Sequence, residues 1–283
     1  MAAAGGQSSG AKDAQVELRK LAIEAASKGD LDALAAFDND IILTARDADE
    51  RSALHRAVAE GHAAAAARLC EERAGVAVRL IACKDAAGWG PMHTAAAKGL
   101  AAAVRAMAVV VSAHARELLE SESQDAGAAA SKVFNAKTNA GATALSLAAS
   151  KGREEALGAL LEARGGSAAD GTPSGQPIKL NVADRNGLTA MHRAAMAGRA
   201  ACVRMLLDAG ADPERTDATG HTVLAAAAEA KEQSVVSLLL EWGAEPGRAN
   251  DDGATPAALA LPDELLAQII IDAQRSRGEA PPR

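Results

Sequence analysis

Three histidines are the residues best suited to proton transfer or metal binding in this sequence: His55, His93 and His192. An imidazole can carry a proton near neutral pH or ligate a metal. Each of the three, however, stands at the same place in a recurring local sequence, which favours a structural role. No Ser or Thr has a His backed by a carboxylate in an arrangement that would make it a nucleophile. We therefore predict no catalytic residue, no metal site and no cofactor, and expect that the chain is not an enzyme.

Composition excludes several other classes of protein. The three cysteines, Cys70, Cys83 and Cys202, show no Cys-x-x-Cys pair and no metal-ligand spacing, which indicates free thiols in a reducing compartment. The formal net charge of −7 argues against nucleic acid or an anionic membrane surface as the main partner. No apolar run is long enough to span a membrane, no signal peptide is recognisable, and no glycine-rich phosphate-binding loop follows a strand. A soluble intracellular protein is expected.

A repeated segment organises the chain. The repeats align as Arg51–Val58, Trp89–Ala96, Ala142–Ala149, Leu188–Ala195, His221–Ala228 and Ala254–Ala260. Their Thr-like positions are separated by 38, 53, 46, 33 and 33 residues. The last two spacings match the 33-residue ankyrin unit, whose signature is Thr-Pro-Leu-His-x-Ala. The sequence thus predicts an all-α ankyrin-repeat solenoid of about seven helix-turn-helix repeats with short β-turn fingers. Thr or Ser should cap each inner helix, and Gly should end it.

The domain boundaries follow from the same alignment. Val16 to Phe37 is predicted to be an atypical first repeat, so that the ankyrin-repeat domain covers residues 14–273. Disordered tails are expected at residues 1–13 and 274–283. Three inserts between repeats are expected near residues 74–83, 109–135 and 165–179. The second should extend an outer helix and end in an Ala/Gly/Ser loop, in which Ala126–Ser131 contributes nothing to the core.

Residues that a solenoid does not need for stacking are the candidates for binding. Inner-helix flanks and fingertips should line a continuous concave surface. Trp89 is the most informative of them, because Trp and Arg dominate interface hot spots; the alternative is that its ring folds back onto the next finger. The complete predicted protein-binding set is Asp49, Arg51, Arg56, Trp89, Lys98, Lys151, Arg193 and His221. The charges of the groove are mixed in sign, which suits a partner face of mixed charge.

Some segments go beyond the general repeat signature and resemble the gankyrin family. These are Ala48–His55, Asp85–His93, Ala148–Arg153 and Thr189–Ala195. The family consists of seven-repeat proteins that act as non-ATPase regulatory subunits and assembly chaperones of the proteasome. The resemblance implies a monomeric, cytoplasmic and nuclear protein that grips the C-terminal domain of a proteasomal regulatory-particle ATPase subunit.

In that family the grip uses an Arg and a Trp on successive fingertips and a Lys at the end of the following inner helix. Arg51, Trp89 and Lys151 occupy those positions here, and Asp49 matches an acidic contact. Two family features are missing: Ala86 replaces a second acid, and Ala226–Ala230 replaces a Leu-x-Cys-x-Glu motif. A generic ankyrin-repeat adaptor in signalling or substrate recruitment is the alternative, and an enzyme subunit is the least favoured class.

Overall fold

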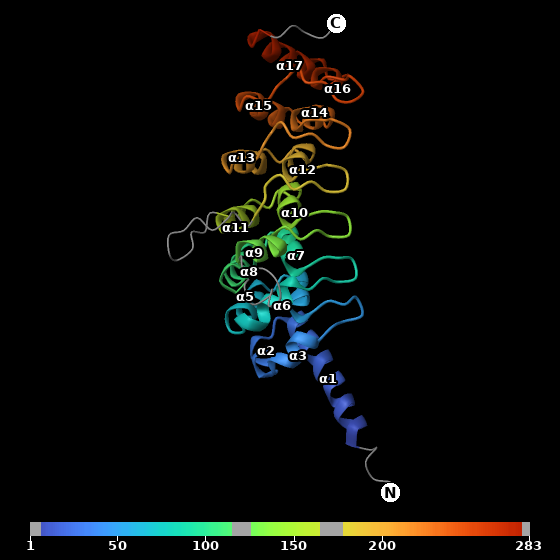
Figure 1. Ribbon diagram of the computed structural model, residues 1–283, viewed down its shortest axis with the longest axis vertical. Coiled ribbons are helices and arrows are strands. Elements are labelled where there is room, and N and C mark those ends of the chain that lie inside the picture. Colours follow the sequence, from blue (N-terminus) through green and yellow to red (C-terminus); the bar gives the residue numbers. More distant parts are fainter. Residues whose placement is uncertain (1–6, 115–125, 165–177, 279–283) are drawn as a thin grey trace.

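The computed structural model describes residues 7–114, 126–164 and 178–278, and it shows an elongated stack of helical pairs with loops projecting to one side (Figure 1). Each inner helix packs on the inner helices of adjacent units, and the outer helices form a second column beside them. The inner helices are α1 (Gln7–Lys28), α4 (Ala53–Glu60), α7 (Pro91–Lys98), α10 (Ala144–Ser150), α12 (Ala190–Met196), α14 (Val223–Glu229) and α16 (Pro256–Leu259). The outer helices are α2 (Leu31–Ala36), α5 (Ala63–Glu71), α8 (Ala101–His114), α11 (Glu154–Arg164), α13 (Ala200–Asp208), α15 (Gln233–Glu241) and α17 (Glu264–Ser276). The all-α solenoid of seven helix-turn-helix units is confirmed.

The predicted caps position the inner helices. The hydroxyls of Thr143 and Thr222 each accept a hydrogen bond of 3.2 Å from the backbone N–H three residues on, which satisfies a donor that the helix leaves unpaired. At the other end, Gly198 closes α12 with a positive φ of 68°. Lys231 replaces this glycine in the next unit, yet it adopts nearly the same backbone, with φ of 61°. The turn is therefore kept, at the cost of a left-handed non-glycine residue.

Small side chains let the inner helices approach one another closely. In four successive units the core positions of the inner helix are paired alanines that are 0% exposed: Ala95 with Ala96, Ala148 with Ala149, Ala194 with Ala195, and Ala227 with Ala228. Larger residues such as Leu54, Met191 and Leu224 fill the space between layers. This alternation of small and large side chains explains how a chain with 1% aromatic residues builds a dry core.

Three additional helices lie between an outer helix and the following finger, and the second and third of them fall within predicted inserts. They are α3 (Asn39–Thr44), α6 (Ala74–Ala82) and α9 (Ala126–Phe134). The segment Ala126–Ser131 was expected to be a loop without core residues, but it forms most of α9. Ala130 is buried together with Phe134 at the end of the same helix, and α9 packs against α8. Of the insert predicted near residues 165–179, residues 165–177 lie outside the described part of the chain.

Two helices extend into the segments predicted to be tails. Helix α1 begins at Gln7, within the expected tail of residues 1–13, and α17 continues to Ser276, beyond the expected boundary at residue 273. The remaining residues 1–6 and 279–283 lie outside the described part of the chain. No helix among the described residues is both long and apolar enough to cross a membrane.

Candidate protein-binding face

A side-chain acceptor fixes the turn of each finger. One carboxylate oxygen of Asp85 accepts hydrogen bonds from the backbone N–H groups of Ala87 (3.0 Å) and Trp89 (2.8 Å). The same arrangement recurs at Asp47, Asp184, Asp217 and Asn250. Burial by itself would raise the pKa of Asp217, but the hydrogen bonds from Thr219 and from the His221 N–H outweigh it and lower the pKa. These carboxylates hold the loops and are therefore not spare acid or base groups.

The three recurring histidines tie each finger to the next. The Nε2 atom of His55 donates to the Trp89 carbonyl (3.0 Å), that of His93 to Ala136 (2.8 Å) and that of His192 to His221 (3.2 Å). Their Nδ1 atoms accept from the backbone N–H at the start of the same helix, as at Gly90 (3.0 Å). Burial lowers the pKa of all three histidines, so they make these hydrogen bonds as neutral imidazoles. The predicted structural role of these histidines is confirmed.

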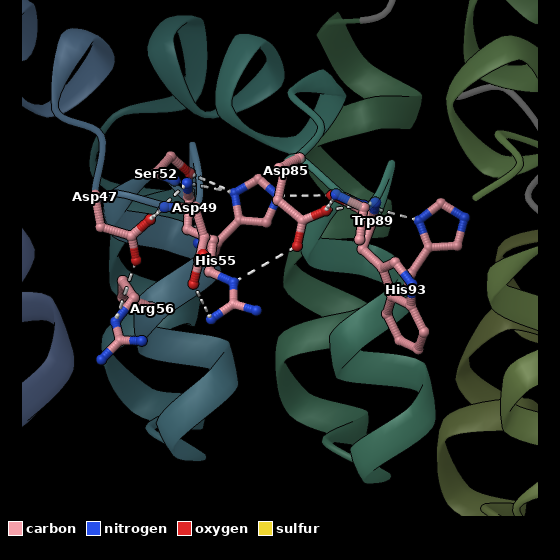
Figure 2. Close-up of polar contacts among 12 residues, drawn as sticks. Asp47, Asp49, Ser52, His55, Arg56, Asp85, Trp89 and His93 are labelled. Carbon is pink, nitrogen blue, oxygen red and sulfur yellow. Dashed lines mark hydrogen bonds and ion pairs between the residues drawn. The ribbon is translucent and has the colours of Figure 1, made fainter. Parts of the chain in front are cut away.

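Three arginines of the predicted set are neutralised within the molecule. The guanidinium of Arg51 lies between Asp49 (3.2 Å) and the nearly buried carboxylate of Asp85 (3.5 Å). Arg56 contacts Glu60 at 3.1 Å and Asp47 at 3.8 Å. Figure 2 shows the contact of Arg56 with Asp47.

The third arginine repeats the pattern further along the stack. Arg193 is paired with Asp184, whose side chain is 2% exposed; the guanidinium Nε atom lies 2.8 Å from the carboxylate. The sequence identified the positions of all three arginines, but it did not reveal that each already has a carboxylate partner.

Trp89 is only partly exposed. Its ring centroid lies 6.4 Å from that of His93 in the same unit, with the planes tilted by 59°. The indole points along the inner helices, on the same side of the fingers as the guanidinium of Arg56 (Figure 2). The ring thus lies against its own unit and keeps one part open to the concave side. Its role as a binding anchor stays a prediction.

The other members of the predicted set differ in how firmly they are held. Lys151, at the end of α10, is exposed and has no ion-pair partner among the described residues. The ammonium of Lys98 donates to the carbonyl of Ala59 in the preceding inner helix. The imidazole of His221 is 15% exposed and contacts Asn250 (2.9 Å). Of these three, Lys151 is the one free to meet a partner.

Exposed apolar side chains were missed in the sequence. Met196, at the end of inner helix α12, is 46% exposed, and Trp242, which ends outer helix α15, is 44% exposed. Aligning the repeats could have revealed both, because the equivalent positions hold Ser150 and Ala209. On the concave side Met196 follows Arg193 by three residues, so the two side chains share one face of the helix. The concave surface therefore combines an open apolar side chain with neutralised charges.

The comparisons with known proteins agree with this geometry. Residues 174–250 match the family model of ankyrin repeats (3 copies). No curated protein sequence matches the chain. Among solved structures, the human ASB11 ankyrin repeat domain superposes with a TM-score of 0.65 and 23% identity, over 93% of this chain and 99% of that one. The likeness concerns the fold; it extends over the whole stack, including units that the family model does not reach.

Proposed function

We propose that this chain, whose repeats match the ankyrin type, is a non-enzymatic adaptor that docks another protein on its concave face. Ankyrin repeats are protein-interaction modules, and stacked units present one extended concave surface. The observation that carries the proposal is Met196, a 46% exposed apolar side chain on the inner-helix face. A flexible thioether can adapt to an apolar partner surface. The charges beside it are already paired, so docking would not require an unpaired ion to lose its water.

Rigidity supports the same function. The histidine bridges and the Asp-held turns fix the fingers before any partner arrives. A preorganised surface loses little conformational entropy on binding, which leaves more of the contact energy for affinity. The groups that a catalytic centre would need are instead used for stacking, which is why a binding role is preferred.

A site-specific photocrosslinker tests the adaptor proposal. Placed at Met196 it should capture a partner protein, whereas the same group at Val109, which is 67% exposed on outer helix α8, should not. The captured partner is then purified and titrated against Met196→Lys and Val109→Lys. We expect at least about tenfold weaker binding for the first and no change for the second, because a buried charge in an apolar contact is unpaired. Equal crosslinking or equal affinities would contradict a concave docking face.

A gankyrin-type proteasome chaperone is the second candidate. It is favoured by Arg51 and Trp89, which lie on successive fingertips, and by Lys151, an exposed cation at the end of the next inner helix. Under this proposal the chain would be a monomer of the cytoplasm and nucleus, and its partner the C-terminal domain of a regulatory-particle ATPase subunit. Direct calorimetry with purified ATPase C-terminal domains decides between the candidates: binding weakened by Lys151→Glu supports the chaperone, and absence of binding leaves the adaptor.

A further inference from the structure

Three hollows follow one another along the segments that lead into the fingers. The first lies between the end of α3 and the end of α6 and includes Arg46 and Arg79. The second, about 330 Å³, lies between α6 and α9 and includes Lys84 and Lys132. The third is formed by residues 178–182 with Gly210 and Arg215, and it includes Lys179. No exposed inner-helix residue lines any of them, so this surface is separate from the concave face.

Hydrogen bonds between units show that the three hollows are neighbours. Ala82 and Cys83 line both the first and the second hollow. The ammonium of Lys84, in the second hollow, donates to the Lys137 carbonyl of the next unit (2.8 Å). The backbone N–H of Lys179, in the third hollow, donates to the side chain of Asn135, just after α9 (2.9 Å). The three hollows therefore lie in a row across several units.

The charge of these hollows is unlike that of the chain as a whole. Each hollow is lined by two cations, and none of the described residues that line it is Asp or Glu. The six cations, named here the basic flank, are Arg46, Arg79, Lys84, Lys132, Lys179 and Arg215. All but Arg46 are exposed, and none pairs with a carboxylate of the described residues. In a chain of net charge −7, positive charge is thus left uncompensated in one place.

Buried or partly buried apolar side chains also line the hollows and form their floor. Ile81, Met92 and Val133 line the second hollow, and Ile178 and Leu180 line the third. Binding of single-stranded nucleic acid relies on aromatic side chains that stack on bases. No Phe, Trp or Tyr lines the three hollows among the described residues, so the bases of a nucleic acid would have no ring to stack on. A peptide that carries both carboxylates and apolar side chains fits the cations and the floor together.

We propose that the basic flank is a second docking surface, which binds an acidic peptide segment of a partner protein with apolar side chains between its carboxylates. The carboxylates pair with the flank cations, and the apolar side chains enter the hollows. The adaptor would then hold two ligands at once, one on the concave face and one on the flank. This proposal does not depend on what the concave face binds.

The test measures fluorescence anisotropy of a labelled peptide with the full chain in low salt. The peptide is rich in Glu and has Leu at regular intervals. Two further probes are the same peptide with Gln for Glu, and a single-stranded DNA of the same length. The flank variant is Arg79→Glu/Lys132→Glu/Lys179→Glu, one exposed cation from each hollow. The control, Lys12→Glu/Arg204→Glu/Lys231→Glu, reverses the same number of exposed cations elsewhere and so has the same net charge.

We expect the flank variant to bind the acidic peptide at least about tenfold more weakly than the wild type, because three ion pairs become repulsions. The control should lose less than about threefold, which is the part due to the overall field. The Gln peptide should bind more weakly than the Glu peptide, and Met196→Lys should leave both unchanged. If the flank variant melts early, Arg79→Gln/Lys132→Gln/Lys179→Gln replaces it, with the same expected direction.

Three results would overturn the proposal. Equal losses in flank variant and control would show that net charge alone attracts the peptide. Tighter binding of the DNA would make the flank a nucleic-acid surface. No measurable binding of the Glu peptide by the wild type would mean that the flank cations interact only with solvent. A failure of Met196 to capture a partner would count against the concave proposal and leave this one untouched.

Discussion

Acidification should destabilise the fold through the three bridging histidines. His55, His93 and His192 are at most 3% exposed, and burial holds the pKa of each below its ordinary value of 6.5. As the pH falls below 6.5, the unfolded chain takes up protons that the folded chain does not. The free energy of unfolding must then decrease, while above that pH it should be constant with respect to these groups.

The size of the effect follows from the number of groups. One proton bound by the unfolded state and not by the folded state changes the free energy of unfolding by about 1.4 kcal/mol per pH unit. Three equivalent histidines give at most about 4 kcal/mol per pH unit, a large part of the stability of a domain. Protonation would also place a second N–H where Nδ1 now accepts one, so each cap would lose its acceptor.

Urea unfolding followed by circular dichroism at several pH values between about 7.5 and 5.5 measures this slope. The comparison is a triple variant, His55→Ser/His93→Ser/His192→Ser, chosen because Ser146 occupies the same position and makes the same cap in its own unit. The variant should be less stable at neutral pH but should lose much less stability on acidification. The reasoning is refuted if both proteins show the same slope, or if the wild type keeps its stability down to pH 5.5.

Two further predictions concern stacking and thiol reactivity. Gly187→Ala should lower the free energy of unfolding by more than Gly253→Ala. Both glycines have a left-handed backbone, which costs an alanine about 1–2 kcal/mol. At Gly187 the new Cβ would also lie 2.4 Å from a backbone nitrogen of the next finger, whereas at Gly253 it would meet no atom within 4 Å. If chemical denaturation shows equal losses of unfolding free energy for the two variants, the next finger can move away from the new Cβ at little cost. Iodoacetamide should modify Cys83 in the native protein and spare Cys70 and Cys202, whose pKa burial raises to about 12 and about 11; mass spectrometry that found equal labelling would show that the units open readily.

The repeat signature made the stack predictable from the sequence, because each signature residue has a local role. A capping Thr and a closing Gly act within a few residues of themselves, so their pattern can be recognised without knowledge of the rest of the fold. The bridge made by His192 reaches the next finger, and it was predictable because the same residue recurs at the same repeat position in His55 and His93. Lys231 breaks the pattern but still adopts the expected turn, which is held by local backbone hydrogen bonds from Lys231 to Ala228 (3.0 Å) and from Glu232 to Ala227 (3.0 Å).

The sequence did not reveal which residues far apart in the chain pair with one another. Arg51 stands two residues from Asp49, which the sequence shows, but its second partner, Asp85, comes from the next finger. Likewise, the helix at residues 126–134 begins with small residues that do not reveal its partner, and it packs against α8. Propensity and spacing describe a chain locally, whereas these features depend on which units become neighbours.

The charge distribution is where this limitation matters most for function. A net charge of −7 correctly describes the far field and makes a nucleic-acid partner unattractive, yet a net value says nothing about which charges are already neutralised. On the concave face Arg56 and Arg193 are each paired with a carboxylate of the same repeat unit. Their positive charge is therefore already neutralised by contacts with the fingers. On the flank Lys132 and Lys179 come from the inserts between repeats, where no signature Asp is nearby. Half of the basic flank, namely Arg79, Lys132 and Lys179, therefore lies in segments that the repeat does not require. Variation in the inserts would change this second surface without disturbing the first.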